Sequence, residues 1–273
     1  MCTMPDMLQA LNGHTQGTAA TAIDVAPRLG LRIRPYRTED RAAIRQICAD
    51  TAWQGGPGGV HVPDDWLWGE FWTRYFTDRE PEHTWVVERA ADAPVVEHGV
   101  NARVVGYLSG TVDCRRAERY TYALLPGIVR HIWSVRLWRR RGPRRALLDM
   151  LASLLCGDTR LPRGVAAAYP ATFHFNLLPE ARGQGIGTRL FRTFETEIQQ
   201  LGVPGLHTQS LDVNAGVARF NERAGLAIVG RRPTRAFGHI ESRPIAILTW
   251  TKGLRPCVPL TSRGEVPRVA PRS

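Results

Sequence analysis

Three glycines in the stretch HFNLLPEARGQGIGTRLFRTFETEI, residues 174–198, are well placed to let main-chain atoms bind a ligand. Gly183, Gly185 and Gly187 follow an apolar, strand-like run and precede an amphipathic, helix-like run. Because glycine has no Cβ, the amides around it can approach a ligand closely. The first N–H groups of a helix have no internal partner, and the helix dipole favours negative charge there. With the guanidinium of Arg182 in front, which can fork onto phosphate oxygens, the spacing predicts a pyrophosphate-binding turn over residues 182–188.

Two other phosphate motifs fit this turn poorly. A P-loop needs Gly-Lys-Ser/Thr after its glycines, but Gly187 is followed by Thr188 and Arg189. A dinucleotide fold needs G-x-G-x-x-G directly after the strand, and here the third glycine is missing. Asp212 could act as the acid of that fold, but too little chain follows it to complete such a domain. An acyl-CoA site explains more of the pattern.

The bulk properties predict one folded domain with decorations. The chain has 273 residues, 43% of them hydrophobic, which is enough for a sizeable core. A net charge of +11 suggests an anionic partner, but the arginines are spread along the chain and do not indicate specific nucleic acid binding. The five cysteines lie far apart without a CxxC pair, so neither a zinc site nor a disulfide framework is indicated. There is no signal-peptide pattern, and we expect a cytoplasmic protein.

The segments that must position the turn alternate in an order typical of a mixed sheet. We expect strands and helices in the order β-α-α-β-β, an insert, and then β-α-β-α-β-β, which is an α+β pattern. The expected parts are a flexible leader over 1–29, a domain over 30–253 and a flexible tail over 254–273. The insert, residues 113–169, reads as two helices broken at Gly142-Pro143. Its arginine-dense stretch, 130–145, could touch a membrane or an acidic partner, or form a solvated lid on the domain.

Two spaced motifs resemble the GNAT superfamily of acyl-CoA-dependent N-acyltransferases. Arg182, Gly185 and Gly187 match its Arg/Gln-x-x-Gly-x-Gly/Ala turn. Its second motif, N-x-x-A-x-x-F-Y-x-[KR]-x-G-F, is matched by Asn214, Phe220, Arg223 and Gly225. The resemblance covers residues 31–252, and YPATFHFNLLPEARGQGIGTRLF with RPIAILTW is similar to bacterial members related to the acetyltransferase-like domain of O-GlcNAcase. It implies a GNAT-like, mostly antiparallel twisted sheet flanked by helices, with the helical insert between the third and fourth strands.

The resemblance also implies a cofactor site around a splayed strand. In the family this strand hydrogen-bonds the pantetheine arm and points an amide at the thioester carbonyl, a role that falls here to Leu177 or Leu178. The expected cofactor-binding residues are Leu177, Leu178, Arg182, Gly183, Gln184, Gly185, Ile186, Gly187, Thr188, Asn214, Phe220 and Arg223. The co-substrate is acetyl-CoA, and no metal is expected.

The catalytic positions depart from the family pattern. His174 and Asn176 point to one side of their strand, and the histidine could act as base for the acceptor amine. Asn176 cannot take a proton where relatives carry Asp, and Asn221 replaces the tyrosine that protonates the leaving thiolate. His207 and Asp212 are possible substitutes, although structural roles suit them better.

The aromatic helix-like run DDWLWGEFWTRYF falls where the family lines its acceptor cleft. Asp64, Asp65 and Glu70 could attract a cationic amine, although helix capping suits the two aspartates better. The resulting hypothesis is an acetyl-CoA-dependent N-acetyltransferase that acts on a primary amine of a small molecule by direct attack in a ternary complex, with a homodimer allowed. The alternative is a catalytically weak GNAT-fold module that binds acyl-CoA or regulates a partner.

Overall fold

The computed structural model describes residues 23–26, 30–90, 103–239 and 244–254. They form an eight-stranded sheet in the order β1-β2-β3-β4-β5-β6-β8-β7. The strands are β1 (Ile23–Ala26), β2 (Leu31–Pro35), β3 (Thr84–Arg89), β4 (Arg103–Thr111), β5 (Ala171–Leu177), β6 (Gly205–Leu211), β7 (Ala227–Thr234) and β8 (Ile245–Gly253). Every neighbouring pair is antiparallel except β5 and β6, which are parallel. The predicted mixed, mostly antiparallel sheet is confirmed.

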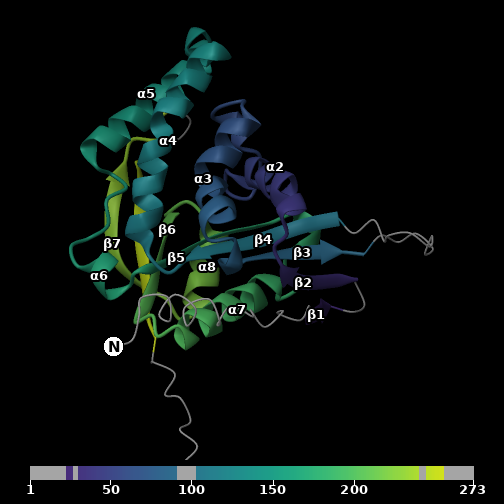
Figure 1. Cartoon of the computed structure of the whole chain (residues 1–273). Coiled ribbons are helices and arrows are strands. Elements are labelled where there is room, and N and C mark those ends of the chain that lie inside the picture. Colours follow the sequence, from purple (N-terminus) through teal and green to yellow (C-terminus); the bar gives the residue numbers. More distant parts are fainter. Residues whose placement is uncertain (1–22, 27–29, 91–102, 240–243, 255–273) are drawn as a thin grey trace, which may run out of the picture.

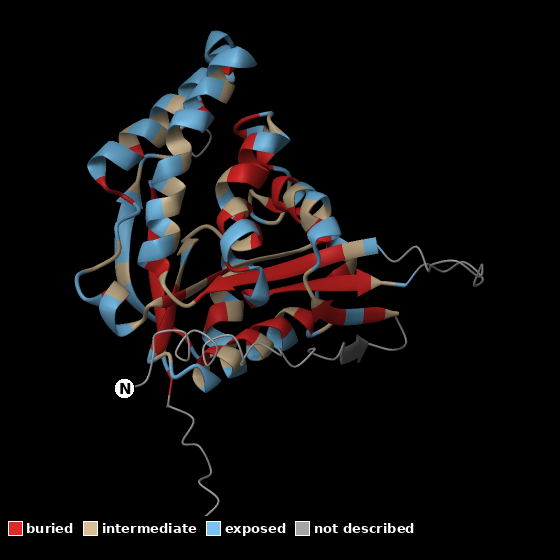
Figure 2. Ribbon diagram, viewed as in Figure 1, coloured by how far each residue is buried: buried red, intermediate tan, exposed pale blue. Residues whose placement is uncertain are grey.

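Helices cover both faces of this sheet, as Figure 1 shows. On one face lie α2 (Arg41–Thr51) and α3 (Asp65–Arg79), and on the other lie α7 (Ile186–Gln200) and α8 (Ala215–Arg223). The fully buried rings of α7, Phe191 and Phe194, pack under the central strands. At Gly110 of β4 an added Cβ would come within 2.2 Å of the Phe194 ring, so α7 rests directly on the strand backbone. The buried strands and helix faces appear red in Figure 2.

The helical insert lies between β4 and β5, which are the third and fourth strands counted from Leu31. It contains α4 (Cys114–Ser134), α5 (Arg141–Cys156) and the short α6 (Val165–Ala168). The break between its two long helices is at residues 135–140, and our prediction of a break at Gly142-Pro143 was wrong. Pro143 sits in the first turn of α5, where a missing N–H costs nothing because the amides there have no helical acceptor anyway.

The expected flexible leader needs one correction. Residues 23–26 form β1, which pairs antiparallel with β2, so regular structure starts before residue 30. The rest of the leader and tail residues 255–273 lie outside the described residues. Among the helices that the structure describes, none is long and apolar enough to cross a membrane.

Candidate active site

The sheet opens where β5 and β6 separate. These parallel strands pair only at Ala171 with Leu206 and at Thr172 with His207, whereas β4 stays paired with β5 as far as Leu177. From residue 173 onward, the edge of β5 that faces away from β4 therefore has no partner strand among the described residues. An open strand edge leaves main-chain N–H and C=O groups available to a ligand.

The alternation of strand hydrogen bonds decides which amide faces this opening. The N–H of Leu178 donates to the carbonyl of Val105 at 2.9 Å, and Leu177 lies opposite Gly106 in the same register. Adjacent residues of a strand point their N–H groups to opposite edges, so the amide of Leu177 faces away from β4. Of the two leucines predicted as the oxyanion donor, only Leu177 has an amide that faces the opening, so only Leu177 remains a candidate. The amide of Leu178 is already hydrogen-bonded within the sheet, and its side chain is buried in the core.

The glycine turn presents a row of amides without acceptors. After the 3-10 turn η6 (Pro179–Ala181), Gly183 and Gly185 adopt φ values of +74° and +75°, and Gly185 caps the start of α7. Within the described residues no protein atom accepts a hydrogen bond from the amides of residues 183–188, and the first bond of the helix runs from Arg189 to Gly185. A Cβ added at Gly183 or Gly185 would meet nothing within 4 Å. The turn is open, positively polarised by the helix dipole, and shaped to receive an anion.

Gln184 and Ile186 shape this turn through their side chains. The side-chain amide of Gln184 donates to the carbonyl of Glu180 at 2.9 Å, which fixes the entry of the turn. Ile186 is buried and anchors the first turn of α7 in the core, while Thr188 is exposed. Because the side chain of Ile186 is held in the core, the backbone of this turn faces outward.

The guanidinium of Arg182 bonds to two main-chain carbonyl groups, and its predicted contact with a phosphate stays a prediction. Its Nε donates to the carbonyl of Leu177 at 2.8 Å and its Nη2 donates to the carbonyl of Gly55 at 2.7 Å. Gly55 lies in the tight turn that joins Trp53 to Gly56. The guanidinium therefore ties the open end of β5 to the loop between α2 and α3.

Three apolar groups form the floor beneath the first turn of α7. A Cβ added at Gly187 would lie 3.5 Å from Phe175, 3.6 Å from Phe220 and 3.7 Å from Leu177. The rings of Phe175 and Phe220 are 4.7 Å apart. Phe220, predicted from the second motif, thus joins α8 to the open edge of β5.

The other predicted residues of α8 have different positions. Asn214 caps the helix by accepting from the amide of Val217 at 3.1 Å, so its oxygen has a structural role. Arg223 lies in the last turn of the helix. Asn221 is only 1% exposed, and neither its side-chain nitrogen nor its oxygen has a hydrogen-bond partner among the described residues. A buried amide without partners is costly, which makes Asn221 a polar group held ready for a ligand or a strained one.

His174 and Asn176 lie together on the other face of β5. Both contact the hydroxyl of the fully buried Tyr107, His174 through Nδ1 at 3.1 Å and Asn176 through its side-chain nitrogen at 3.1 Å. The ring of Trp72 stacks on His174 at 5.7 Å. Burial lowers the pKa of His174 to about 4, so the imidazole is neutral at neutral pH. Trp72 is 45% exposed, whereas His174 behind it is half-buried.

The two substitutes weighed from the sequence have structural partners. His207 hydrogen-bonds the carbonyl of Tyr169 through Nδ1 at 2.6 Å, and burial lowers its pKa. Asp212 pairs with Arg231 at 2.8 Å and accepts from the amide of Ala246 at 3.1 Å. Both residues hold the strands around the opening in place.

The carboxylates of α3 are also engaged. Asp64 accepts from the amide of Leu67 at 2.8 Å as the helix cap and contacts Nε2 of His131 at 2.9 Å. Glu70 is 4% exposed and lies between Arg45 at 2.5 Å and Arg74 at 3.1 Å. Its charge is therefore neutralised inside the protein and is not presented to an amine. Asp65 lies in the first turn of α3 and is exposed.

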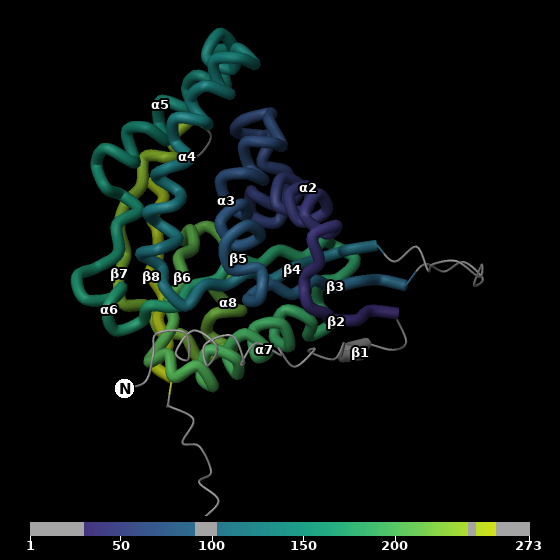
Figure 3. Tube along the Cα trace, viewed as in Figure 1, coloured from purple at the N-terminus to yellow at the C-terminus, as the bar shows by residue number. Residues whose placement is uncertain are grey.

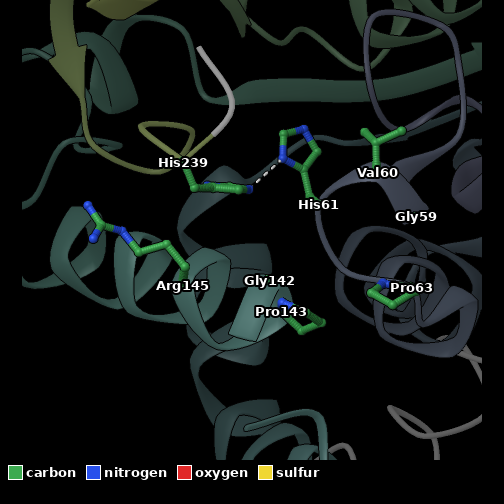
Figure 4. Close-up of a pocket in the computed structure, with 8 residues that line it drawn as sticks. All are labelled: Gly59, Val60, His61, Pro63, Gly142, Pro143, Arg145 and His239. Atoms are coloured by element: carbon green, nitrogen blue, oxygen red, sulfur yellow. Dashed lines mark hydrogen bonds between the residues drawn. The ribbon is translucent and has the colours of Figure 1, made fainter. Parts of the chain in front are cut away.

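A cavity of about 340 Å³ lies beside this region, between the loop after α2, the start of α5 and the turn after β7. Figure 4 shows its lining residues, which are Gly59, Val60, His61, Pro63, Gly142, Pro143, Arg145 and His239. Nδ1 of His61 is 3.0 Å from Nε2 of His239, whose Nδ1 is 3.3 Å from Asp149. Burial and then the neighbouring His239 lower the pKa of His61 to about 4.

Sequence reasoning missed this acid–histidine–histidine chain. Its members come from three segments separated by many residues, and no spacing in the sequence relates them. The only local hint was a histidine in the glycine-rich loop 54–63, where loop histidines often serve function. The described residues contain no group of three or more His, Cys, Asp or Glu side chains that could hold a metal ion.

Solved structures of other proteins resemble the fold of this chain. No family model matches the chain. The structure resembles that of SsHAT, with 22% identity, a TM-score of 0.53, and coverage of 82% of this chain and 98% of that one. It also matches the Drosophila melanogaster polyamine N-acetyltransferase (14% identity, 82% and 100% coverage, TM-score 0.47) and a GCN5-related N-acetyltransferase from Kribbella flavida (16% identity, 84% and 100% coverage, TM-score 0.47). The strand order, the helices on both faces and this likeness show that the chain has a GNAT-like fold.

Proposed function

We propose that the protein is an acetyl-CoA-dependent N-acetyltransferase that acetylates a primary amine of a small molecule by direct attack in a ternary complex. One observation carries the proposal: the acceptor-free amides of residues 183–188 begin α7 directly beside the open edge of β5. Six neighbouring N–H groups at a helix start suit a diphosphate, and an open strand edge suits the amide groups of a pantetheine arm. A site for either group alone would not need both features together.

The residues that would hold acetyl-CoA follow from this geometry. Residues 183–188 would hold the diphosphate through their amides, and Phe175, Leu177 and Phe220 would pack against the arm. Arg182 would act indirectly, because its bonds to Leu177 and Gly55 hold the end of β5 in its open position. Leu178 is left out of the site because its amide is already bonded within the sheet.

The chain also offers groups for the reaction itself. The amide of Leu177 would donate to the oxyanion that forms when the amine nitrogen bonds to the acyl carbon. A donor of this kind lowers the barrier by about 3–4 kcal/mol in enzymes where it was removed. The proton released by the amine nitrogen would pass to the neutral His174, and the carbon–sulfur bond would break to leave a thiolate. Asn221 can offer that sulfur a hydrogen bond but no proton, and a thiol pKa of about 8.5 allows a thiolate to depart.

The acceptor would enter from the side of α3. Trp72 and His174 form one accessible wall, and the cavity lined by His61 and His239 lies behind the same α2–α3 loop that Arg182 ties to β5. Its volume of about 340 Å³ falls in the range of small-molecule pockets. Because Glu70 is neutralised by two arginines, we propose that the acceptor binds as a neutral amine rather than as a cation on this carboxylate.

Thermal denaturation with and without CoA tests the cofactor site. CoA well above a micromolar Kd should raise the melting temperature, because a ligand that binds only the folded state stabilises it. Gly185→Trp should abolish the rise by filling the turn, whereas Gly127→Trp, at another open glycine on exposed α4, should keep it. No rise in the native chain, or an equal rise in both variants, would overturn the assignment.

The alternative function is a GNAT-fold module that binds acyl-CoA with little catalysis. The unpartnered Asn221 and the low pKa of His174 favour it, since neither group is a strong acid or base near neutral pH. A panel of small primary amines with detection of released thiol separates the two functions. Thiol release with any acceptor supports the enzyme, and binding of CoA without release across the panel supports the module.

A further inference from the structure

The end of the α4–α5 hairpin carries exposed aromatic and basic side chains together. Figure 3 shows that the hairpin projects from the sheet and that the join between its helices is its far end. At this end lie the residues that we call the tip patch: Trp133, Val135, Arg136, Trp138, Arg139, Arg140 and Arg141. All seven are exposed. The inward side of the hairpin is already filled, because Leu137, Ile128 and Ala146 are buried in one apolar cluster with residues of α2, α3 and the loop between them.

Two indole rings dominate the apolar part of the tip patch. Trp133 is 61% exposed and Trp138 is 36% exposed, and their centroids are 5.0 Å apart. Val135 beside them is 43% exposed. Soluble surfaces seldom expose two adjacent tryptophans, and indoles favour the boundary between water and lipid, where the ring is buried and the N–H stays wet.

The charged residues of the hairpin segment that carries these rings have one sign. Between residues 119 and 148 the sequence contains eight arginines, no lysine, and no aspartate or glutamate. Among the described residues none of the four tip arginines forms an ion pair, and the guanidinium of Arg139 lies 5.1 Å from the centre of the Trp138 ring. Within the described part of the chain these cations have no carboxylate partner, so they can meet phosphate groups.

The hairpin holds this patch in a fixed place. Nε2 of His131 contacts Asp64 at 2.9 Å, and the ring of Trp66 lies 4.0 Å from that of His131. Both contacts join the last turn of α4 to the start of α3, two residues before Trp133. The patch is therefore presented by a braced helix end.

We propose that the tip patch docks the protein onto an anionic lipid surface. The two indoles would enter the headgroup region while the four arginines contact lipid phosphates. A second copy of the chain fits this patch poorly, because two tip patches face to face would bring eight arginines together without a carboxylate. Docking would also bring the lipid surface close to the 340 Å³ cavity, since Gly142 and Pro143 follow the patch directly and line that cavity.

Sedimentation of the full chain with lipid vesicles tests the proposal. The protein should pellet with vesicles of phosphatidylcholine and phosphatidylglycerol but stay in solution with phosphatidylcholine alone. Each basic residue near an anionic surface strengthens binding about fivefold, so Arg139→Gln with Arg140→Gln and Arg141→Gln should weaken it about 100-fold. Trp133→Ala with Trp138→Ala should also release the protein and abolish a blue shift of tryptophan emission on binding.

A variant with the same change of charge supplies the control. Arg37→Gln with Arg163→Gln and Arg192→Gln removes three exposed arginines outside the hairpin and should keep most of the vesicle binding. All three variants should keep the far-ultraviolet circular dichroism of the native chain. Equal loss of binding in the tip and control variants would overturn the proposal, because general charge attraction would then suffice. An absence of vesicle binding would also overturn the proposal. Binding of nucleic acid by the native chain, or formation of a dimer detected by light scattering, would then identify the occupant of the patch.

Discussion

The first turn of α7 gives a sharp test because stability and CoA binding should change there in opposite directions. Gly187 is the second residue of α7 and does not have a positive φ. Alanine favours a helix over glycine by up to about 1 kcal/mol. The added methyl group would lie 3.5–3.7 Å from Phe175, Phe220 and Leu177, which is ordinary contact. Gly187→Ala should therefore raise the melting temperature of the free protein, by about 2–4 °C at the most.

The same methyl group should weaken CoA binding. It would stand on the turn whose amides we propose to bind the diphosphate, and beside the open edge of β5. At a ligand concentration of 100 times Kd, native protein gains about 2.7 kcal/mol, and a tenfold loss of affinity leaves about 1.4 kcal/mol. The rise in melting temperature caused by CoA should thus fall to about half in Gly187→Ala.

Gly142→Ala is the matched control. Gly142 is also the second residue of a helix, α5, without a positive φ, and a Cβ there meets nothing within 4 Å. It should give a similar rise for the free protein and leave the rise caused by CoA unchanged. If CoA raised the melting temperature of Gly187→Ala as much as that of the native chain, the start of α7 would not contact the cofactor. If Gly187→Ala without CoA melted at a lower temperature than the native chain, the added methyl group would not fit between Phe175, Phe220 and Leu177 as described.

Three further predictions concern buried polar groups. Asn221→Leu should raise the free energy of unfolding in urea by about 1–3 kcal/mol, because it removes a buried amide without partners, and a decrease would mean that the amide is satisfied. The pKa of His174, lowered by burial to about 4, means that its contribution to stability is complete above about pH 6.5 and is lost as the pH falls toward 4, so His174→Gln should flatten the stability profile there. Burial raises the pKa of Glu88, but hydrogen bonds from Arg32 and Arg34 lower it below its usual value overall, so its contribution holds above about pH 4.3 and is lost in stronger acid. Glu88→Gln should remove that acid-dependent step from urea titrations at several pH values.

The features that local sequence could predict are those with local causes. The glycine turn was readable because a positive φ at Gly183 and Gly185 and a helix start at Ile186 depend on neighbouring residues. The insert was readable as helical from its periodicity. The break inside it was placed wrongly because Gly-Pro also suits the first turn of a helix, and only the path of the chain distinguishes the two.

Features that depend on distant segments could not be predicted in this way. The bond of Arg182 to the carbonyl of Gly55 could not be predicted, because Gly55 lies 127 residues away. The pairing of His61 with His239 joins positions 178 residues apart. Glu70 looked like a free carboxylate until Arg45 and Arg74 were found on either side of it. The sequence analysis singled out Arg182 and Glu70 but neither His61 nor His239, and in each case it could not show the partners of the side chain.

The choice between Leu177 and Leu178 also depends on a distant segment that the local sequence does not show. In a strand, side chains alternate between faces, and the N–H groups alternate between edges. The sequence HFNLLP shows the first alternation through its apolar pattern, but nothing in it shows which edge meets a neighbouring strand. That edge is fixed by the register with β4, where Val105 takes the amide of Leu178. Because β6 diverges after Thr172, the amide of Leu177 is left facing the opening. A shift of one residue in the pairing with β4 would exchange the two positions, so this long-range register determines which leucine amide faces the opening where we propose that the oxyanion forms.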